Sequence, residues 1–304
     1  MAKKILITGA SGLVGSRLSE WLEREGHQVV SLTRGSKGKG AGAFEWDIER
    51  GRADTECLDG VDTIIHLAGA GIADKPWTPA RKEEILNSRV KSTTLLLGLL
   101  QNTRHQVRTV VAASAIGYYG LGTEGQIFEE SSPPGDDFLA RVVRQWEAAV
   151  DRMASLPIRV VKLRIGIVFS QKGGALTAIA KPVKWGLGAP LGNGRQYLSW
   201  IHLDDLCRMF VHAMQREDMN GPYNAVAEEP VTNKALTRAI ANVLNRPLWL
   251  PAVPGFVLQW MLGEMAALVL NGSQVSAQKI VQTGFVFSYP RLHDALQNLL
   301  GSRG

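Results

Sequence analysis

The sequence predicts an α/β fold with a doubly wound parallel sheet, and two observations carry that prediction. The first lies at the N-terminus, where a short apolar run at residues 5–7 precedes three glycines at positions 9, 12 and 15 and then an amphipathic pattern. The second is the alternation of strand-like and helix-like segments over the first two-thirds of the 304 residues. Such alternation is typical of parallel strands joined by crossover helices that cover both faces of the sheet.

The expected elements are short runs with the periodicity of strands or helices. The expected strands are Lys4–Thr8, Gln28–Leu32, Thr63–Leu67, Thr109–Ser114 and Arg159–Leu163. The expected helices are Leu13–Glu25, Ala80–Leu100 and Ala140–Met153. Right-handed crossovers between such strands place ligands at the carboxyl ends of the strands.

Glycines and prolines become frequent after residue 173, and the strand–helix alternation weakens there. Trp200–Leu203 is expected to be a short strand, with Asp204 or Asp205 capping the helix that follows. We therefore expect residues 1–170 to form a Rossmann-type domain, to which later segments return. Residues 171–304 are expected to form mainly a smaller C-terminal substrate-side lobe with a helical final segment.

Composition narrows the class of protein. The hydrophobic share of 45% is typical of a soluble globular protein. The two cysteines lack metal-ligand spacing and suggest no disulfide framework, so a cytoplasmic location is expected. Neither a signal-peptide core nor a membrane-spanning stretch is present, so we expect no membrane partner.

The net charge of +6 comes from scattered basic residues, so no nucleic-acid partner is expected, and the charge suits a phosphate-bearing ligand. A cluster of basic residues at 34–39 lies where a cofactor phosphate is expected. His202, Asp204 and Asp205 lack a second ligand cluster, so no metal site is expected.

The glycine turn predicts a dinucleotide site. Gly9 allows the tight turn, Gly12 lets the backbone approach a pyrophosphate, and Gly15 lets the helix pack closely on the strand. NAD enzymes carry an acid after the second strand, which binds the ribose 2′-hydroxyl. Here Thr33 and Arg34 stand at that position, and both can bind a 2′-phosphate, so the sequence favours NADP(H).

Further residues are expected at the carboxyl ends of other strands. Asp47 would lie near the adenine amino group if residues 44–47 form a third strand, although it could equally be a turn residue. Leu67, Ala68 and Gly69 would let the ribose and phosphates lie against the backbone. Arg164 follows a strand on the side where the nicotinamide is expected.

Several motifs resemble those of a known family. TGASGLVG at 8–15, HLAG at 66–69 and a serine-containing strand before Tyr-Gly resemble the extended short-chain dehydrogenase/reductase superfamily. Other motifs resemble one atypical branch, the epimerase family proteins related to nucleotide-sugar epimerases. They are NSR at 87–89, GYYG at 117–120, WEAA at 146–149, GNGRQY at 192–197 and WIHLDD at 200–205.

This resemblance spans nearly the whole chain and implies a Rossmann-type domain, NADP(H) binding and a small C-terminal lobe. It names no substrate. It also implies that the NSR motif lies on the cofactor side, where Arg89 could reach a phosphate. The full set of expected cofactor-binding residues is Gly9, Ser11, Gly12, Leu13, Val14, Gly15, Thr33, Arg34, Asp47, Leu67, Ala68, Gly69, Glu84, Arg89, Arg164 and Val168.

The resemblance further implies a catalytic Ser, Tyr and Lys, with the last two spaced Tyr-x-x-x-Lys on one helix so that both face the nicotinamide. Ser114 matches the serine position. Phe138 stands where the tyrosine is expected and Val142 where the lysine is expected. Phenylalanine cannot exchange a proton and valine cannot carry a charge. No other Tyr-x-x-x-Lys occurs in the chain.

Three alternatives follow from this replacement. In the first, Tyr118 or Tyr119 supplies the proton, although either ring could instead be packing at a strand end. In the second, a substrate group or a bound water carries the proton. In the third, the protein binds NADP(H) without catalysis, as a sensor or scaffold, with a link to cell division as one variant.

The leading interpretation is an oxidoreductase or epimerase-like enzyme that acts on a small carbonyl, alcohol or nucleotide-sugar substrate. Its expected catalytic residues are Ser114, Tyr118 and Tyr119. The sequence is compatible with a homodimer.

Overall fold

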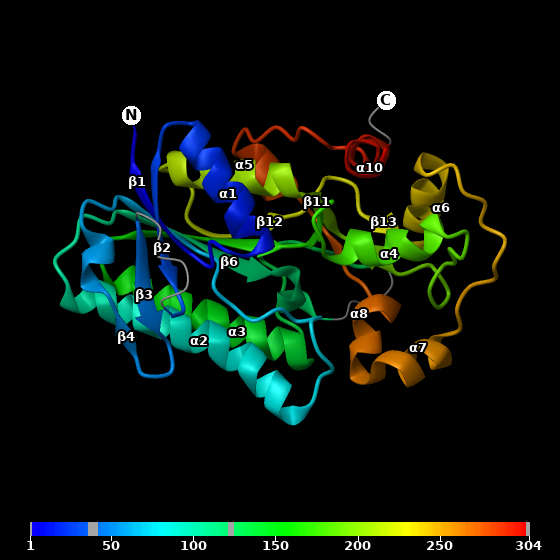
Figure 1. Ribbon diagram of the computed structural model, residues 1–304, viewed down its shortest axis with the longest axis horizontal. Coiled ribbons are helices and arrows are strands. Elements are labelled where there is room, and N and C mark those ends of the chain that lie inside the picture. The colour runs from blue at the N-terminus through cyan, green and yellow to red at the C-terminus, as the bar shows by residue number, and fades with distance from the viewer. Residues whose placement is uncertain (1, 36–41, 121–124, 302–304) are drawn as a thin grey trace.

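The computed structural model describes residues 2–35, 42–120 and 125–301. Within these ranges, eight strands form one sheet in the order β12-β8-β6-β5-β1-β2-β3-β4 (Figure 1). Neighbouring strands are parallel except β3 and β4, which form an antiparallel edge. The strands are β1 Lys4–Thr8, β2 Gln28–Thr33, β3 Ala43–Asp47, β4 Arg52–Ala53, β5 Thr63–His66, β6 Thr109–Ala115, β8 Arg159–Ile165 and β12 Gly221–Ala225.

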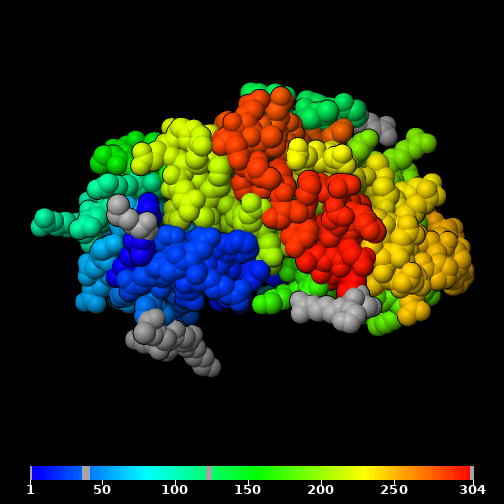
Figure 2. Space-filling model, turned by 90° about the horizontal axis from the view of Figure 1, so that it is seen from above, coloured from blue at the N-terminus to red at the C-terminus, as the bar shows by residue number. Residues whose placement is uncertain are grey.

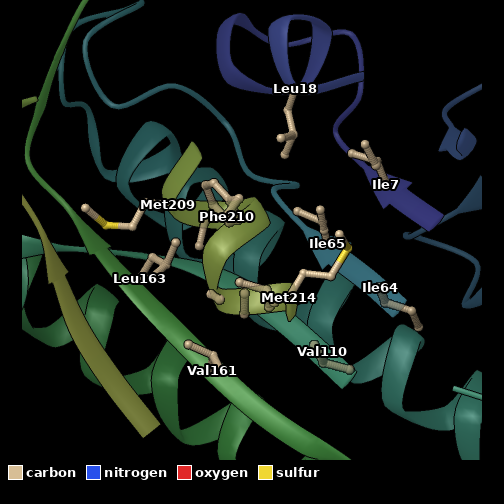
Figure 3. Close-up of a cluster of buried hydrophobic side chains, with 14 of the residues drawn as sticks. Ile7, Leu18, Ile64, Ile65, Val110, Val161, Leu163, Met209, Phe210 and Met214 are labelled. Atoms are coloured by element: carbon tan, nitrogen blue, oxygen red, sulfur yellow. The ribbon is translucent and has the colours of Figure 1, made fainter. Parts of the chain in front are cut away.

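Helices cover both faces of this sheet. In Figure 1, α1 (Leu13–Arg24) and α5 (Leu203–Gln215) lie on one face, and α2 (Pro79–Asn102) and α3 (Phe138–Asp151) lie on the other. Figure 3 shows side chains of α1 and α5 pointing onto the strands, among them Leu18 and Phe210, which are fully buried. Burial of these apolar faces is the main force that holds the helices on the sheet.

The expected Rossmann-type, doubly wound α/β fold is confirmed, and the expected strands and helices lie within a few residues of their predicted bounds. Strand β12, which joins the sheet beside β8, was not predicted from the sequence. Its sequence, Gly-Pro-Tyr-Asn-Ala, lacks the run of β-branched residues that marks a buried strand. Residues 44–47 do lie in a third strand, as the placement of Asp47 requires.

A second group of buried apolar residues lies beyond the main sheet, around α4 (Ala175–Lys184), α6 (Asn233–Val243) and α10 (Leu292–Leu300). Phe169 and Trp200 stack at its centre with ring centroids 5.2 Å apart. The remaining strands are β7 Ile127–Phe128, β9 Ile167–Phe169, β10 Tyr197–Leu198, β11 Trp200–His202, β13 Val231–Thr232 and β14 Gln274–Val275. The remaining helices are η1 Thr55–Leu58, η2 Ile116–Tyr119, η3 Arg152–Ser155, α7 Gly255–Leu262, η4 Gly263–Ala266, α8 Ala267–Leu270 and α9 Gln278–Gln282.

The chain returns to the first part of the molecule through α5 and the C-terminal tail, which Figure 2 shows lying across the α1 face. The imidazole of His202 caps α5 by accepting from the backbone N–H of Asp204, so the expected acid cap is not the one formed. Asp204 instead binds Arg17 on α1. Asp205 accepts the backbone N–H groups of residues 288 and 289 and so fixes the tail.

No helix within the described ranges is long and apolar enough to cross a membrane. The described residues also contain no group of three or more His, Cys, Asp or Glu side chains arranged to hold a metal ion.

Candidate functional site

The glycine turn joins β1 to α1 at the carboxyl edge of the sheet. Gly9 has φ +74°, and a Cβ atom there would lie 3.0 Å from the backbone of Leu67. A Cβ atom on Gly15 would lie 2.3 Å from the carbonyl oxygen of Gly9. The helix therefore begins directly against the strand, and no side chain caps its N-terminus at Gly12. Backbone N–H groups at a free helix N-terminus favour an anionic ligand.

A buried histidine fixes the neighbouring 67–69 loop. Thr8 Oγ1 accepts the backbone N–H groups of Leu67 and Ala68, at 3.1 and 3.3 Å. With its acceptor positions used, the Thr8 hydroxyl donates to His66 Nδ1, at 2.7 Å. His66 Nε2–H then donates to Thr93 Oγ1, at 3.0 Å, and the Thr93 hydroxyl donates to the carbonyl of Arg89.

This chain of donors requires a neutral His66. Its imidazole is fully buried, and burial lowers its pKa to about 4. Protonation would add a second N–H donor at Nδ1, where the Thr8 hydroxyl already donates. The neutral ring therefore joins β1, β5 and α2 below the expected pyrophosphate position.

A cavity of about 550 Å³ opens at the carboxyl ends of β2 and β3, against α2. Its lining includes Arg34, Asp47, Ile48, Ala70, Ser88 and Lys91. The backbone N–H of Ala70 donates to Ser88 Oγ at 2.9 Å, which ties the floor of the cavity to α2. We call this cavity the adenosine-end cavity, after the part of a dinucleotide that lies there in doubly wound folds.

Three expected cofactor residues line the adenosine-end cavity, namely Arg34, Asp47 and Glu84. Asp47 Oδ1 accepts the backbone N–H groups of residues 49 and 50, so the carboxylate also shapes the turn after β3. The carboxylate of Glu84 accepts from Arg81 Nη1 at 2.6 Å, and this bond lowers its pKa. Thr33 ends β2, and its hydroxyl donates to the Phe44 carbonyl at 3.4 Å. Of the expected basic cluster, residues 36–39 lie outside the described residues.

Arg89 lies between the 67–69 loop and α3. Its side chain passes so close to Gly69 that a Cβ atom there would lie 3.2 Å from it. Its guanidinium lies 5.2 Å from the ring centroid of Trp146, and Nη1 donates to the Ile85 carbonyl. Burial, with the nearby charge of Arg81, lowers the Arg89 pKa to about 10. No carboxylate among the described residues forms an ion pair with it, so this cation suits an anionic ligand.

The remaining expected cofactor residues lie near the same edge. Ser11 and Gly12 are exposed in the turn, and Leu13 and Val14 open α1. Val168 lies in β9, paired with Ile201 of β11.

A buried ionic network occupies the other end of the sheet edge. Glu147 on α3 accepts Arg164 Nε at 2.8 Å and Nη2 at 2.9 Å, which is a bidentate pair. The Ser114 hydroxyl donates to the same carboxylate at 2.5 Å, and Lys162 Nζ lies 3.4 Å from it. All four side chains are buried. Burial alone would raise the pKa of Glu147, but Arg164 and Ser114 outweigh it and hold that pKa below its usual value.

The two tyrosines of the GYYG motif lie beside this network in different environments. The buried Tyr119 hydroxyl donates to Asn224 Oδ1 at 2.6 Å and accepts from Arg164 Nη1 at 3.0 Å. Burial raises its pKa to about 12. Tyr118 is half-buried, with its ring centroid 3.5 Å from the Arg164 guanidinium carbon.

The replaced Tyr–Lys pair lies on α3 as expected. Phe138 is the first residue of the helix, and its ring packs edge-on against Trp77 at 5.1 Å. Lys82 Nζ lies 5.3 Å from the Phe138 ring centroid and pairs with Glu264 of η4. Val142 is buried, and Arg141 turns to solvent, as the 100° helical step predicts.

Sequence reasoning overlooked several of these residues. His66 and Glu147 stand inside the HLAG and WEAA motifs, so a buried polar residue flanked by apolar ones was a signal that could have marked both. Lys91 and Ile48 carried no such signal, because exposed lysines and single aliphatic residues are common anywhere.

Comparison with known proteins places this geometry in a family. Residues 5–226 match the model of the NAD dependent epimerase/dehydratase family. The chain belongs to that family. Residues 253–299 of this epimerase-family chain match a second model, that of a domain of unknown function (DUF1731).

Relatives of this epimerase-family chain share its full length. It is 36% identical over 302 residues to the epimerase family protein YfhF of Bacillus subtilis, covering 98% of both chains. It is 36% identical to a chloroplastic SDR39U1 homologue of Arabidopsis thaliana, covering 97% of this chain and 86% of that one. The crystal structure of human SDR39U1 with NADPH superposes with a TM-score of 0.89 at 31% identity, covering 97% and 98% of the two chains.

A nucleoside-diphosphate sugar epimerase from Corynebacterium glutamicum is similar as well. It has a TM-score of 0.81 and 31% identity, and the match covers 99% of this chain and 59% of that one. The resemblance to the epimerase family is thus confirmed, and this chain has an NAD(P)-binding epimerase-family fold.

Proposed function

We propose that this protein binds NADP(H) and exchanges a hydride and a proton with a small carbonyl, alcohol or nucleotide-sugar substrate. The observation that carries the NADP(H) part is the adenosine-end cavity, with Arg34 in its lining directly after β2. A guanidinium there can pair with a 2′-phosphate, whereas NAD enzymes need an acid at this position. The human relative with bound NADPH supports the same proposal.

The residues present fit the pyrophosphate and the adenosine parts of the cofactor. The backbone of the glycine turn would hold the pyrophosphate, and Arg89 would supply a nearby positive charge. Asp47 and Glu84 would face the adenosine. When bound, NADP(H) supplies or accepts the hydride, and the proton must come from another group.

We further infer that Tyr118, rather than Tyr119, exchanges the proton. The Tyr119 hydroxyl is held by Asn224 and Arg164, and its raised pKa disfavours proton release near neutral pH. The Ser114 hydroxyl is likewise held, by Glu147. The Tyr118 hydroxyl makes no hydrogen bond to any described residue, and its ring lies 3.5 Å from the Arg164 guanidinium carbon, next to the network that contains Ser114.

A second candidate function, a non-catalytic sensor of NADP(H), rests on a different observation. The position of the catalytic lysine is filled by Val142, whose side chain is buried in the helix packing. A protein that only binds the cofactor has no need for a base there.

The remaining parts of the proposal concern the domain organisation, the substrate class, the location and the assembly of the protein. We infer that residues after 170 form a substrate-side lobe around the second apolar cluster, with β12 returning to the main sheet. The match to a nucleoside-diphosphate sugar epimerase supports a nucleotide-sugar substrate. A cytoplasmic location and a homodimer stay part of this proposal.

Calorimetric titration with NADPH and NADH tests cofactor choice. Arg34→Ala should weaken NADPH binding by about 10- to 100-fold, because a charged hydrogen-bond pair contributes about 1.5–3 kcal/mol. NADH affinity should not change. Arg24→Ala, which removes an exposed arginine at the end of α1, is the matched control and should leave both affinities unchanged. Equal affinity of the unmodified protein for both cofactors would overturn the NADP(H) proposal.

Activity separates the two candidate functions. The protein with NADPH or NADP⁺ is incubated with a panel of nucleotide sugars, ketones and alcohols, while the reduced nicotinamide is followed by absorbance and the sugar products by chromatography, because epimerisation leaves the nicotinamide unchanged overall. Turnover that falls at least about tenfold in Tyr118→Phe, with unchanged NADPH affinity, supports the enzyme and the proton role. Tight NADPH binding without turnover on any substrate of the panel favours the sensor.

A further inference from the structure

Large apolar side chains gather at the end of the molecule farthest from β3 and β4. Helix α7 carries Phe256, Trp260 and Met261 with exposed fractions of 72%, 88% and 65%, and only Leu258 of this helix is buried. The loop after α4 carries Trp185 and Leu187, exposed by 69% and 52%. Figure 1 places α4, α6 and α7 together at this end.

Hydrogen bonds join these two exposed segments. Trp249, which is 67% exposed, donates its indole N–H to the Gly186 carbonyl at 2.9 Å. Val253 forms a parallel bridge with Leu191, and the Gly192 N–H donates to the Val253 carbonyl. We call the set the aromatic tip, which consists of Trp185, Leu187, Trp249, Phe256, Trp260 and Met261.

An apolar set of this kind is uncommon on the surface of a monomer and marks a contact site. The segment 247–263 contains no charged residue at all.

The charge around the aromatic tip has one sign. The two stretches that build this end, 171–203 and 230–263, contain seven basic residues and no acidic one. Lys172 lies 3.8 Å from Glu20 on α1 and so away from the tip, which leaves at most six of these basic residues near it, and Glu264, which follows α7, pairs with Lys82 of α2. All seven basic side chains are exposed, and Lys181 Nζ lies 5.3 Å above the Trp185 ring.

The charge and the composition of the aromatic tip favour one kind of partner over the others. A second copy docked tip to tip would bring two positively charged ends together, which is unfavourable. A nucleic acid would need basic residues interleaved with the aromatic ones, and the 247–263 segment has none. An anionic lipid surface meets both requirements, because tryptophans lie at the headgroup level and flanking lysines and arginines attract anionic lipids.

We propose that the aromatic tip docks on the surface of an anionic lipid bilayer, with α7 lying in the interface and Lys181, Lys184 and Arg246 facing the headgroups. This is a surface contact and needs no spanning helix. The expectation of no membrane partner rested on the absence of a spanning stretch, which does not bear on such a contact.

Co-sedimentation of the full chain with vesicles tests the proposal. Vesicles of phosphatidylcholine alone are compared with vesicles that contain one-third phosphatidylglycerol. The unmodified protein should sediment with the anionic vesicles only, and high salt should weaken this binding. The double variant Phe256→Ser/Trp260→Ser should bind at least about tenfold more weakly, because it removes two apolar anchors.

The matched control removes exposed apolar residues elsewhere. Val286 and Ile127 are exposed by 70% and 56% and lie outside the aromatic tip, so Val286→Ser/Ile127→Ser should bind vesicles like the unmodified protein. The charge reversal Lys181→Glu/Lys184→Glu should reduce binding to anionic vesicles. NADPH titration and circular dichroism of every variant verify that each is folded.

Three results would overturn the proposal. The unmodified protein could fail to sediment with anionic vesicles. The Phe256→Ser/Trp260→Ser variant could bind as well as the Val286→Ser/Ile127→Ser control. Light scattering could show a dimer that only the tip variants dissociate, which would assign the surface to a second copy.

Discussion

The two ends of the sheet edge are built in contrasting ways. At the adenosine end, the chain leaves a cavity of about 550 Å³ whose lining combines charged side chains with apolar ones such as Ile48. At the other end, Ser114, Glu147 and Arg164 are buried in a network with short hydrogen bonds among themselves. One end is arranged to receive a ligand, and the other is already satisfied internally.

The difference separates cofactor binding from chemistry. A dinucleotide needs backbone N–H groups, small residues and a few charges, and these are present. Proton transfer needs a group whose hydroxyl or amine is free to exchange a proton, and the network leaves Tyr118 as the best candidate near Ser114. The proposed binding half of the site is therefore conventional, while a buried ion pair occupies the end where the reaction is proposed.

The largest expected effect comes from breaking that ion pair. Glu147→Gln leaves the Arg164 charge buried without its carboxylate, which should lower the free energy of unfolding by about 3–5 kcal/mol. Urea denaturation followed by circular dichroism measures this. Glu23→Gln, an exposed carboxylate on α1, should stay within about 0.5 kcal/mol of the unmodified protein.

The double variant Glu147→Leu/Arg164→Met tests whether the stability lost in Glu147→Gln comes from the unpaired Arg164 charge. Removing both charges should recover much of the stability lost in the single variant, because no uncompensated charge is left buried. A Glu147→Gln cost of less than about 1 kcal/mol would contradict the picture of a closed, satisfied end.

Acid should weaken the cofactor-binding end through His66. The folded pKa is about 4 and the unfolded value is about 6.5, so below pH 6.5 the unfolded chain takes up a proton that the native chain refuses. The His66 contribution is complete above pH 6.5 and is lost as the pH falls toward 4. The loss amounts to about 3 kcal/mol.

Unfolding experiments between pH 7 and pH 4.5 measure this slope. The His66→Gln variant lacks the titrating ring, so its stability should depend less steeply on pH over the same range. Identical slopes for the two proteins would show that the buried imidazole does not titrate in this way.

The smallest effect distinguishes the two adjacent tyrosines. Tyr119→Phe removes a buried hydroxyl that donates to Asn224 Oδ1 and accepts from Arg164 Nη1, so the loss of these two hydrogen bonds should cost about 1–3 kcal/mol of stability. Tyr118→Phe should cost less than about 0.5 kcal/mol. Thermal unfolding of both variants makes the comparison, and equal losses would mean that Tyr118 also belongs to the closed network.

The signals that predict the cofactor-binding end are local in the sequence. The glycine spacing at 9, 12 and 15, and the cation at 34, lie within one strand–helix–strand unit. The same holds for most strands, since buried parallel strands appear as apolar runs. Strand β12 could not be predicted in this way because its five residues include Gly221 and Pro222, which usually indicate a turn.

The network could not be predicted because its members meet only in the folded molecule. The WEAA motif could mark Glu147 as a buried polar residue, but nothing in the sequence shows that Arg164 of β8 faces it. Likewise, the pairing of Tyr119 with Asn224 joins residues 105 positions apart. Single-sequence reasoning could place the two tyrosines at a strand end but could not tell them apart.

The two ends also differ in when they can form as the chain is synthesised. The residues that line the adenosine-end cavity all lie between positions 34 and 91, so the chain has supplied them before a third of it has been made. The network draws on Ser114, Glu147, Arg164 and finally Asn224, whose amide also donates to the Ser276 carbonyl. Since domains emerge from the ribosome N-terminal part first, the nucleotide pocket has its components while Glu147 still awaits its partner. The residues that line the proposed nucleotide pocket are therefore all synthesised before the last members of the buried network.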